Sequence, residues 1–136
     1  LEEASMQGIQ AWARANPSRL NALLNANPSY VFFRVLPSSN QGPIGLLGQP
    51  LTTERSIAVD PSFIPLGSLV YLATTRPDNQ AAMQRLVAAQ DTGGAIKGSV
   101  RADFFWGTGQ AAGELAGTMK QRGNLWLLWP KDSPLP

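Results

Sequence analysis

The chain has 136 residues and a net charge of only +2, with 43% hydrophobic and 15% charged residues. This composition favours a folded domain over a disordered chain and provides no charge-driven footprint for nucleic acid. Because the sequence contains neither Cys nor His, it excludes thiol nucleophiles, Cys/His zinc sites and every Ser-His-Asp or Cys-His arrangement. Acid–base chemistry must therefore depend chiefly on the nine carboxylates.

The first 29 residues are predicted to form a helical leader that packs on the rest of the chain. Ser5 to Ala15 carries an apolar stripe with helical spacing, and Ser5 is a suitable N-cap. Asn16-Pro17 ends this helix, and Ser18 can cap a second helix that continues through Leu24.

Residues 30–136 are predicted to be mainly β, with six short strands separated by Gly and Pro corners. One helix, Gln110–Arg122, precedes the last strand, with Gly123 at its C′ position. A small closed or nearly closed barrel is expected, because closure removes exposed strand edges. The six segments are Tyr30–Leu36, Arg55–Asp60, Ser68–Thr75, Arg85–Asp91, Ser99–Phe104 and Leu125–Trp129.

Three aspartates lie at or near the ends of apolar strands, where Asp is a poor strand former. For Asp60, which precedes Pro61-Ser62, an Asx-turn is the favoured interpretation. For Asp91, a turn and a functional role are equally supported. A turn explains Asp103 poorly, because Phe104, Phe105 and Trp106 follow it. Apolar neighbours and a nearby carboxylate such as Asp91 would favour the protonated form of Asp103, which suits a proton donor in glycosidic cleavage.

The segment Asp91-Thr-Gly-Gly-Ala-Ile-Lys-Gly is the most distinctive stretch of the sequence. Its glycines allow unusual φ values or close approach of the backbone to a ligand. Lys97 could hold a neighbouring aspartate ionised, bind a substrate oxygen, or simply be solvated. The triplet Asp91-Thr92-Gly93 is also a short signature of aspartic peptidases, but those enzymes need two such aspartates, so one copy per chain would require a homodimer.

Several of these segments together resemble the three-aspartate domain, and more closely the C-terminal part of the membrane-bound lytic transglycosylase A family. The resemblance is carried by Ala58–Pro61, Ile64–Gly67, Asp91–Gly98 and Asp103–Gly109. Asn27–Phe33 resembles that enzyme family in particular. The likeness covers roughly Ser5 to Trp129 and implies a six-stranded double-psi β-barrel.

The resemblance also implies an activity and a set of site residues. The family cleaves the β-1,4 bond between N-acetylmuramic acid and N-acetylglucosamine in peptidoglycan and leaves a 1,6-anhydro product, without a metal or cofactor. The resemblance places the family's catalytic aspartate at Asp103 and puts Asp91 in the same groove. The remaining candidates, for substrate binding, are Asp60, Gly93, Gly94, Lys97, Tyr30 and Phe104.

The family resemblance further implies parts that this sequence does not contain. A second domain forms the other wall of the glycan groove, and we expect the rest of the parent protein to supply it. The family is anchored to the periplasmic face of the bacterial outer membrane through a lipidated Cys, which is absent here. A non-catalytic barrel that binds cell-wall polysaccharide is the main alternative function, and an aspartic peptidase is a weaker one.

Overall fold

The computed structural model describes residues 5–30, 32, 35 and 41–134. The chain forms two compact units, Leu1–Ser38 and Ser39–Pro136, and each unit is described by itself. No helix in the described part of the chain has the length and hydrophobicity needed to cross a membrane.

The N-terminal unit is helical, as the sequence predicts. Helix α1 spans Met6–Ala15, and the Ser5 hydroxyl caps it by accepting a hydrogen bond from the N–H of Gly8 at 3.0 Å. The predicted cap at Ser18 is wrong: this residue lies inside a short 3₁₀ helix, η1, at Pro17–Arg19. Helix α2, Leu20–Leu24, follows directly and has no side-chain cap.

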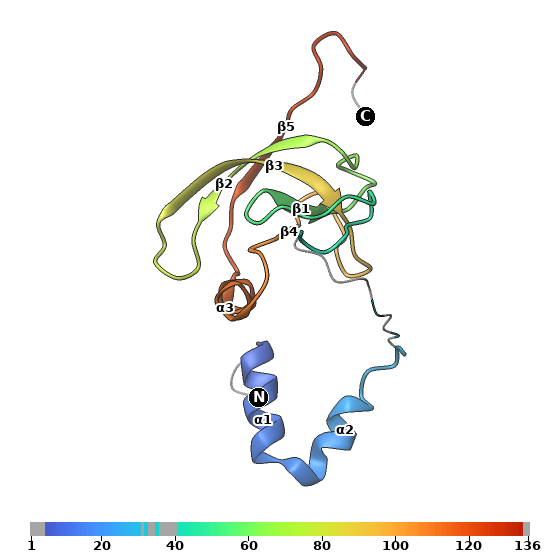
Figure 1. The fold of residues 1–136 in the computed structure, drawn as a ribbon, viewed down its shortest axis with the longest axis vertical. Helices are drawn as coiled ribbons and strands as arrows, with labels where there is room; N and C mark the ends of the chain where they lie inside the picture. The colour runs from blue at the N-terminus through green and yellow to red at the C-terminus, as the bar shows by residue number, and fades with distance from the viewer. Residues whose placement is uncertain (1–4, 31, 33–34, 36–40, 135–136) are drawn as a thin grey trace. The chain divides into compact units, whose positions relative to one another are not determined.

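The C-terminal unit is built on one curled, five-stranded sheet that resembles half of a barrel (Figure 1). Its order is β4-β1-β3-β2-β5, so β4 and β5 are the two edges. All neighbours are antiparallel except β1 and β3, which are parallel. The strands are β1 Ser56–Val59, β2 Leu69–Thr75, β3 Ala82–Asp91, β4 Ala102–Phe104 and β5 Asn124–Leu127.

The prediction of six strands in a closed barrel is therefore wrong for the residues that the structure describes. The first predicted strand, Tyr30–Leu36, falls largely outside the described residues, and its described positions 30, 32 and 35 are not in a strand. The strand predicted over Ser99–Phe104 is limited to its last three residues. Within the described residues, β4 and β5 remain the two edges of an open sheet.

One face of the sheet forms the core of this unit. Buried and exposed residues alternate along β2 and β3, because successive side chains of a strand point to opposite faces. The buried side chains form one cluster, which Leu115 of helix α3 (Gln110–Thr118) also contacts. The cluster comprises Ile57, Val59, Ile64, Val70, Leu72, Met83, Val87, Ala89 and Trp106.

Helix α3 ends four residues earlier than predicted, at Thr118 rather than Arg122. Met119 adopts an extended backbone, and the chain then turns toward β5. Gly123 is consequently not a helix cap. Its role is close approach to β2, because a Cβ atom there would lie 2.6 Å from the backbone oxygen of Ala73.

Candidate functional site

Two of the predicted site aspartates lie on the two strands that flank β1. Asp91 of β3 and Asp103 of β4 are both opposite Ala58 of β1. Directly opposite residues point to the same face of a sheet, and two strand spacings separate their Cα atoms by about 10 Å. The two aspartates therefore share a face, with β1 between them.

A bulge in β3 produces this alignment. Ile57 is opposite Ala89, whereas Ala58 is opposite Asp91, so Gln90 is the extra residue. The bulge is held by buried Ser56, whose hydroxyl donates to the Gln90 side-chain oxygen and accepts from the backbone N–H of Thr52. Without the extra residue, Gln90 rather than Asp91 would lie opposite Ala58.

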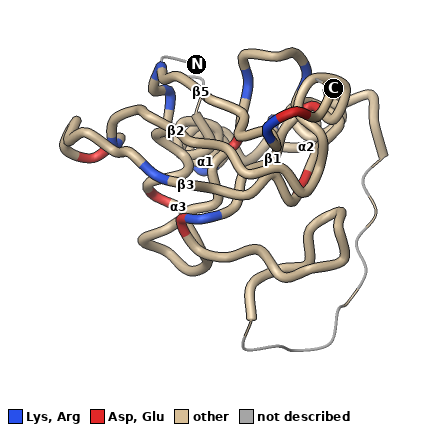
Figure 2. The backbone as a smooth tube through the Cα atoms, turned by 90° about the horizontal axis from the view of Figure 1, so that it is seen from above, with Lys and Arg blue, Asp and Glu red and all other residues tan. Residues whose placement is uncertain are grey.

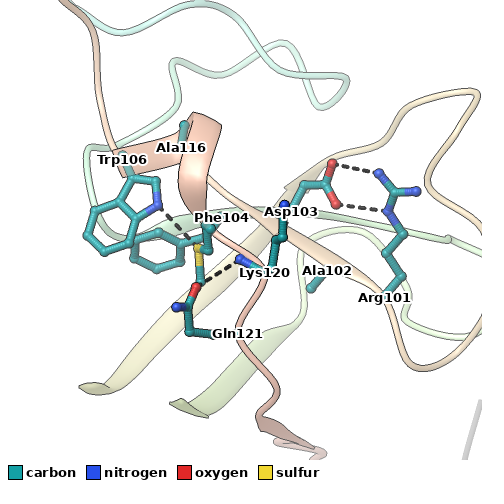
Figure 3. Close-up of a pocket in the computed structure, with 9 residues that line it drawn as sticks. Arg101, Ala102, Asp103, Phe104, Trp106, Ala116, Lys120 and Gln121 are labelled. Carbon is teal, nitrogen blue, oxygen red and sulfur yellow. Dashed lines mark hydrogen bonds and ion pairs between the residues drawn. The ribbon is translucent and has the colours of Figure 1, made fainter. Parts of the chain in front are cut away.

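The Asp103 carboxylate is not in the purely apolar setting that the sequence suggested. Its side chain is 49% exposed, and Arg101 Nε and Nη2 donate to its two oxygens at 3.0 and 3.1 Å (Figure 3). The hydrogen bonds to Asp103 raise the pKa of Arg101. Arg101 Nη1 also donates to the backbone oxygen of Ala95, so one guanidinium links β4 to the glycine-rich segment.

Beside Asp103 is a hollow of about 340 Å³ with an apolar wall and a charged rim. Trp106 is 4% exposed and is fixed by three contacts. Its ring packs edge-on against Phe104 at 4.8 Å, its Nε1–H donates to Met119 Sδ at 3.2 Å, and the guanidinium of Arg76 lies 5.0 Å from the ring centroid. The whole lining comprises Arg101, Ala102, Asp103, Phe104, Trp106, Ala116, Met119, Lys120 and Gln121.

Asp91 does not form the turn with Thr92-Gly93 that its sequence allows. One of its carboxylate oxygens instead accepts the backbone N–H of Leu46 at 3.0 Å. The N–H of Leu47 also donates to the backbone oxygen of Gln90, at 3.4 Å. Asp91 thus joins the end of β3 to the loop that precedes β1.

Asp60 forms the predicted Asx-turn and a second contact that the sequence did not indicate. One oxygen accepts the N–H of Ser62 at 3.1 Å, and the other accepts the N–H of Gly98 at 2.9 Å. The backbone N–H groups of Gly98 and Ser62 lower the pKa of Asp60, burial opposes them, and the charge of Lys97 lowers it further. Gly98 has φ of +94°, which favours glycine at this contact.

The other predicted substrate-binding residues are dispersed. Lys97 and Gly94 are exposed, and Gly93 is half-buried; neither of these two glycines has a positive φ. Phe104 lines the hollow beside Asp103. Tyr30 belongs to the N-terminal unit, where it is 93% exposed and stacks on Phe32 with ring centroids 6.3 Å apart.

Sequence reasoning missed Arg101 and Lys120, which both line the hollow. The order Arg101-Ala102-Asp103 could have indicated the first, because residues two apart in a strand lie on the same face. Lys120 was assigned to a helix that in fact ends at Thr118.

Figure 2 shows the two signs of charge interspersed along the described backbone. Within that part of the chain, no group of three or more His, Cys, Asp and Glu side chains could hold a metal ion.

The site can therefore bind a ring against an apolar wall and present one carboxylate to it. Aromatic faces and edges provide the apolar surface on which a sugar can pack. Asp103 is the carboxylate at this wall, and each of its oxygens keeps a lone pair for a ligand while Arg101 donates to both.

Two protein-family descriptions match the chain: "3D domain" over residues 55–129 and "MltA specific insert domain" over residues 1–34. Among curated proteins, membrane-bound lytic murein transglycosylase A of Escherichia coli (strain K12) is 36% identical over 133 residues. The alignment covers 93% of this chain and 36% of that protein. The chain thus spans about a third of the length of the curated relatives it matches.

Solved structures give the same result. A lytic transglycosylase of Burkholderia pseudomallei is 64% identical, with a TM-score of 0.69, and the match covers 96% of this chain and 39% of that one. Escherichia coli MltA with bound chitohexaose is 35% identical, with a TM-score of 0.80, and the match covers 90% of this chain and 38% of that one.

Proposed function

The chain belongs to the MltA family and carries its 3D domain, and we propose from this premise that the full-length protein is a peptidoglycan lytic transglycosylase. It cleaves the β-1,4 bond between N-acetylmuramic acid and N-acetylglucosamine and forms a 1,6-anhydromuramyl product. One observation carries the proposal: the aspartate that the family resemblance assigns to catalysis borders a hollow walled by Phe104 and Trp106. A glycan bound in that hollow lies beside the one carboxylate in its lining.

In the first step, Asp103 acts as a general acid. It must first take up a proton on one of its two oxygens. It then transfers this proton to the glycosidic oxygen as the bond between that oxygen and C1 of the muramic ring breaks. N-Acetylglucosamine leaves with a new hydroxyl group, and Asp103 is left as a carboxylate.

In the second step, the same carboxylate acts as a general base. The 6-hydroxyl of the muramic ring attacks C1, and Asp103 accepts its proton. This closes the 1,6-anhydro ring and restores the protonated acid, so no water is consumed. By analogy with substrate-assisted glycosidases, the muramic N-acetyl group assists as an internal nucleophile in this proposal.

The remaining site residues support this chemistry in the proposal. Asp91 shares the catalytic face with Asp103, while Asp60, Gly93, Gly94 and Lys97 shape the adjacent segment that contacts the glycan. Phe104 provides part of the apolar wall. Tyr30, in the N-terminal unit, is proposed as a further glycan contact from its family position alone.

The proposed substrate and location follow from the relatives. Curated relatives are named membrane-bound lytic murein transglycosylases, which supports glycan strands of peptidoglycan as the substrate and a bacterial membrane as the place of action. We assign the protein to the periplasmic face of the outer membrane through a lipid anchor. The rest of the parent protein is proposed to supply the second wall of the groove, since this chain spans 36% of the Escherichia coli relative.

Mass spectrometry of purified murein digested with the full-length protein tests the proposal. We expect 1,6-anhydromuropeptides from the native protein and a fall of about 10²- to 10⁴-fold in their rate of release with Asp103→Asn, because one carboxyl performs both proton transfers. Asp132→Asn is the matched control, since Asp132 is exposed and has φ of +65°, which Asn also adopts.

Three results would contradict the proposal in different ways. Reducing-end products from the native protein would make the enzyme a hydrolase. Binding of murein without any released product would favour the alternative of a non-catalytic cell-wall barrel. Equal loss of activity in Asp132→Asn and Asp103→Asn would remove Asp103 from the chemistry.

A further inference from the structure

The charged rim of the hollow beside Asp103 contains an excess of one positive charge. Its lining includes Arg101, Lys120 and a single carboxylate, that of Asp103. Arg101 is committed to Asp103 through two donors and to the Ala95 backbone through a third. Lys120 therefore carries the charge that the lining leaves uncompensated.

The ammonium of Lys120 is available to a ligand. Within the described part of the chain, the side chain of Lys120 has no carboxylate within 4 Å and no other hydrogen bond or ion pair. Its backbone N–H donates to the Gln121 side-chain oxygen at 2.9 Å. The preceding residue, Met119, is held by Trp106 at the apolar wall. Figure 3 shows Lys120 between this wall and the Arg101–Asp103 pair.

We propose that Lys120 is a specificity-determining residue that binds a carboxylate of the substrate while the sugar ring packs against Phe104, which buried Trp106 supports from behind. This inference rests on the proposed function and names the chemical class that the hollow prefers: a glycan with an anionic group next to the ring. A neutral glycan uses the same apolar wall but leaves Lys120 unpaired. Lys120 thereby discriminates between the two classes without taking part in the proton transfers.

Murein has two sources of such a carboxylate. In peptide-free strands, the lactyl group of N-acetylmuramic acid ends in a carboxylate close to the ring. In peptide-bearing strands, this group is part of an amide, and the carboxylates lie along the peptide stem. Both place an anion at the edge of a muramic residue, so the experiment compares the two kinds of strand.

The test measures steady-state release of anhydro products by the full-length protein from native strands and from the same strands with their carboxylates amidated. For native strands, we expect Lys120→Gln to raise KM about tenfold with little change in kcat, because one charge-assisted hydrogen bond is lost. For amidated strands, Lys120→Gln and the native protein should have equal KM values. Lys120→Arg should restore most of the loss, and Lys131→Gln, an exposed position in the tail, should resemble the native protein.

The outcomes separate this inference from the proposed function. A KM effect with peptide-free strands assigns the lactyl carboxylate, and an effect limited to peptide-bearing strands assigns the stem. Equal effects of Lys120→Gln on native and amidated strands, or no effect on either, would overturn the proposal. If the native protein releases no anhydro product, the proposed function fails, and co-sedimentation with the same two kinds of strand still tests Lys120.

Discussion

Replacing Ser56 with Ala should destabilise the C-terminal unit through the bulge that aligns Asp91 with Asp103. Ser56 is 1% exposed, and its hydroxyl joins the Thr52 N–H to the Gln90 side chain. Each such hydrogen bond contributes about 1 kcal/mol net, so losing both should lower the free energy of unfolding by about 2 kcal/mol. The backbone bonds of Ser56 remain, because they do not involve its hydroxyl.

Urea unfolding of the native and Ser56→Ala proteins, followed by tryptophan fluorescence, measures this loss. Ser99→Ala is the matched control, since Ser99 is exposed and in the same unit. The two variants should have the same m value as the native protein, so that a shift in midpoint reports stability alone. If Ser56→Ala lost less than about 0.5 kcal/mol, within the range expected for surface substitutions, the hydroxyl would not be what holds the bulge.

Two further predictions concern Asp60 and two glycines. The pKa of Asp60 is lowered in the folded protein. Its carboxylate therefore stabilises the fold at pH values above its ordinary pKa of about 3.9. This stabilisation is lost as the pH falls through the lower pKa of the folded protein. Urea unfolding between about pH 5 and pH 2 should therefore show a weaker pH dependence for Asp60→Asn than for the native protein; equal slopes would contradict the assignment. Gly107→Ala should cost about 1–3 kcal/mol, because φ is +115° and the new Cβ would lie 2.9 Å from Thr53 Oγ1. Gly113→Ala, in open space on α3, should instead stabilise by about 0.5–1 kcal/mol, and thermal unfolding distinguishes the two.

The elements that the sequence predicted best are those with a local signal. The N-cap at Ser5 and the break at Asn16-Pro17 depend on residues close in sequence. They therefore follow from capping and backbone restriction alone. The Asx-turn at Asp60 belongs to the same group, since its acceptor and donor are two residues apart.

The errors concern contacts between distant residues. Helix α3 ends at Thr118, and the next residue, Met119, has an extended backbone. The sulfur of Met119 accepts a hydrogen bond from Trp106, and no pattern within the helix predicts this contact. The bulge depends on a bond between Ser56 and Gln90, which are 34 residues apart. Whether a sheet closes depends likewise on pairing between its edge strands. The composition of β4 and of β5 does not reveal which strand each one pairs with.

The three aspartates differ most in what holds their oxygens, and this difference supports the choice of Asp103 as the proton carrier. Both oxygens of Asp60 accept backbone N–H groups, and one oxygen of Asp91 accepts the N–H of Leu46. Freeing these oxygens requires movement of the main chain. Asp103 is bound by the side chain of Arg101, which is 47% exposed and can rotate away while the backbone stays in place. Of the three aspartates, Asp103 is also the one that lines the hollow, so a change in its side-chain partner alone presents it to a bound ligand.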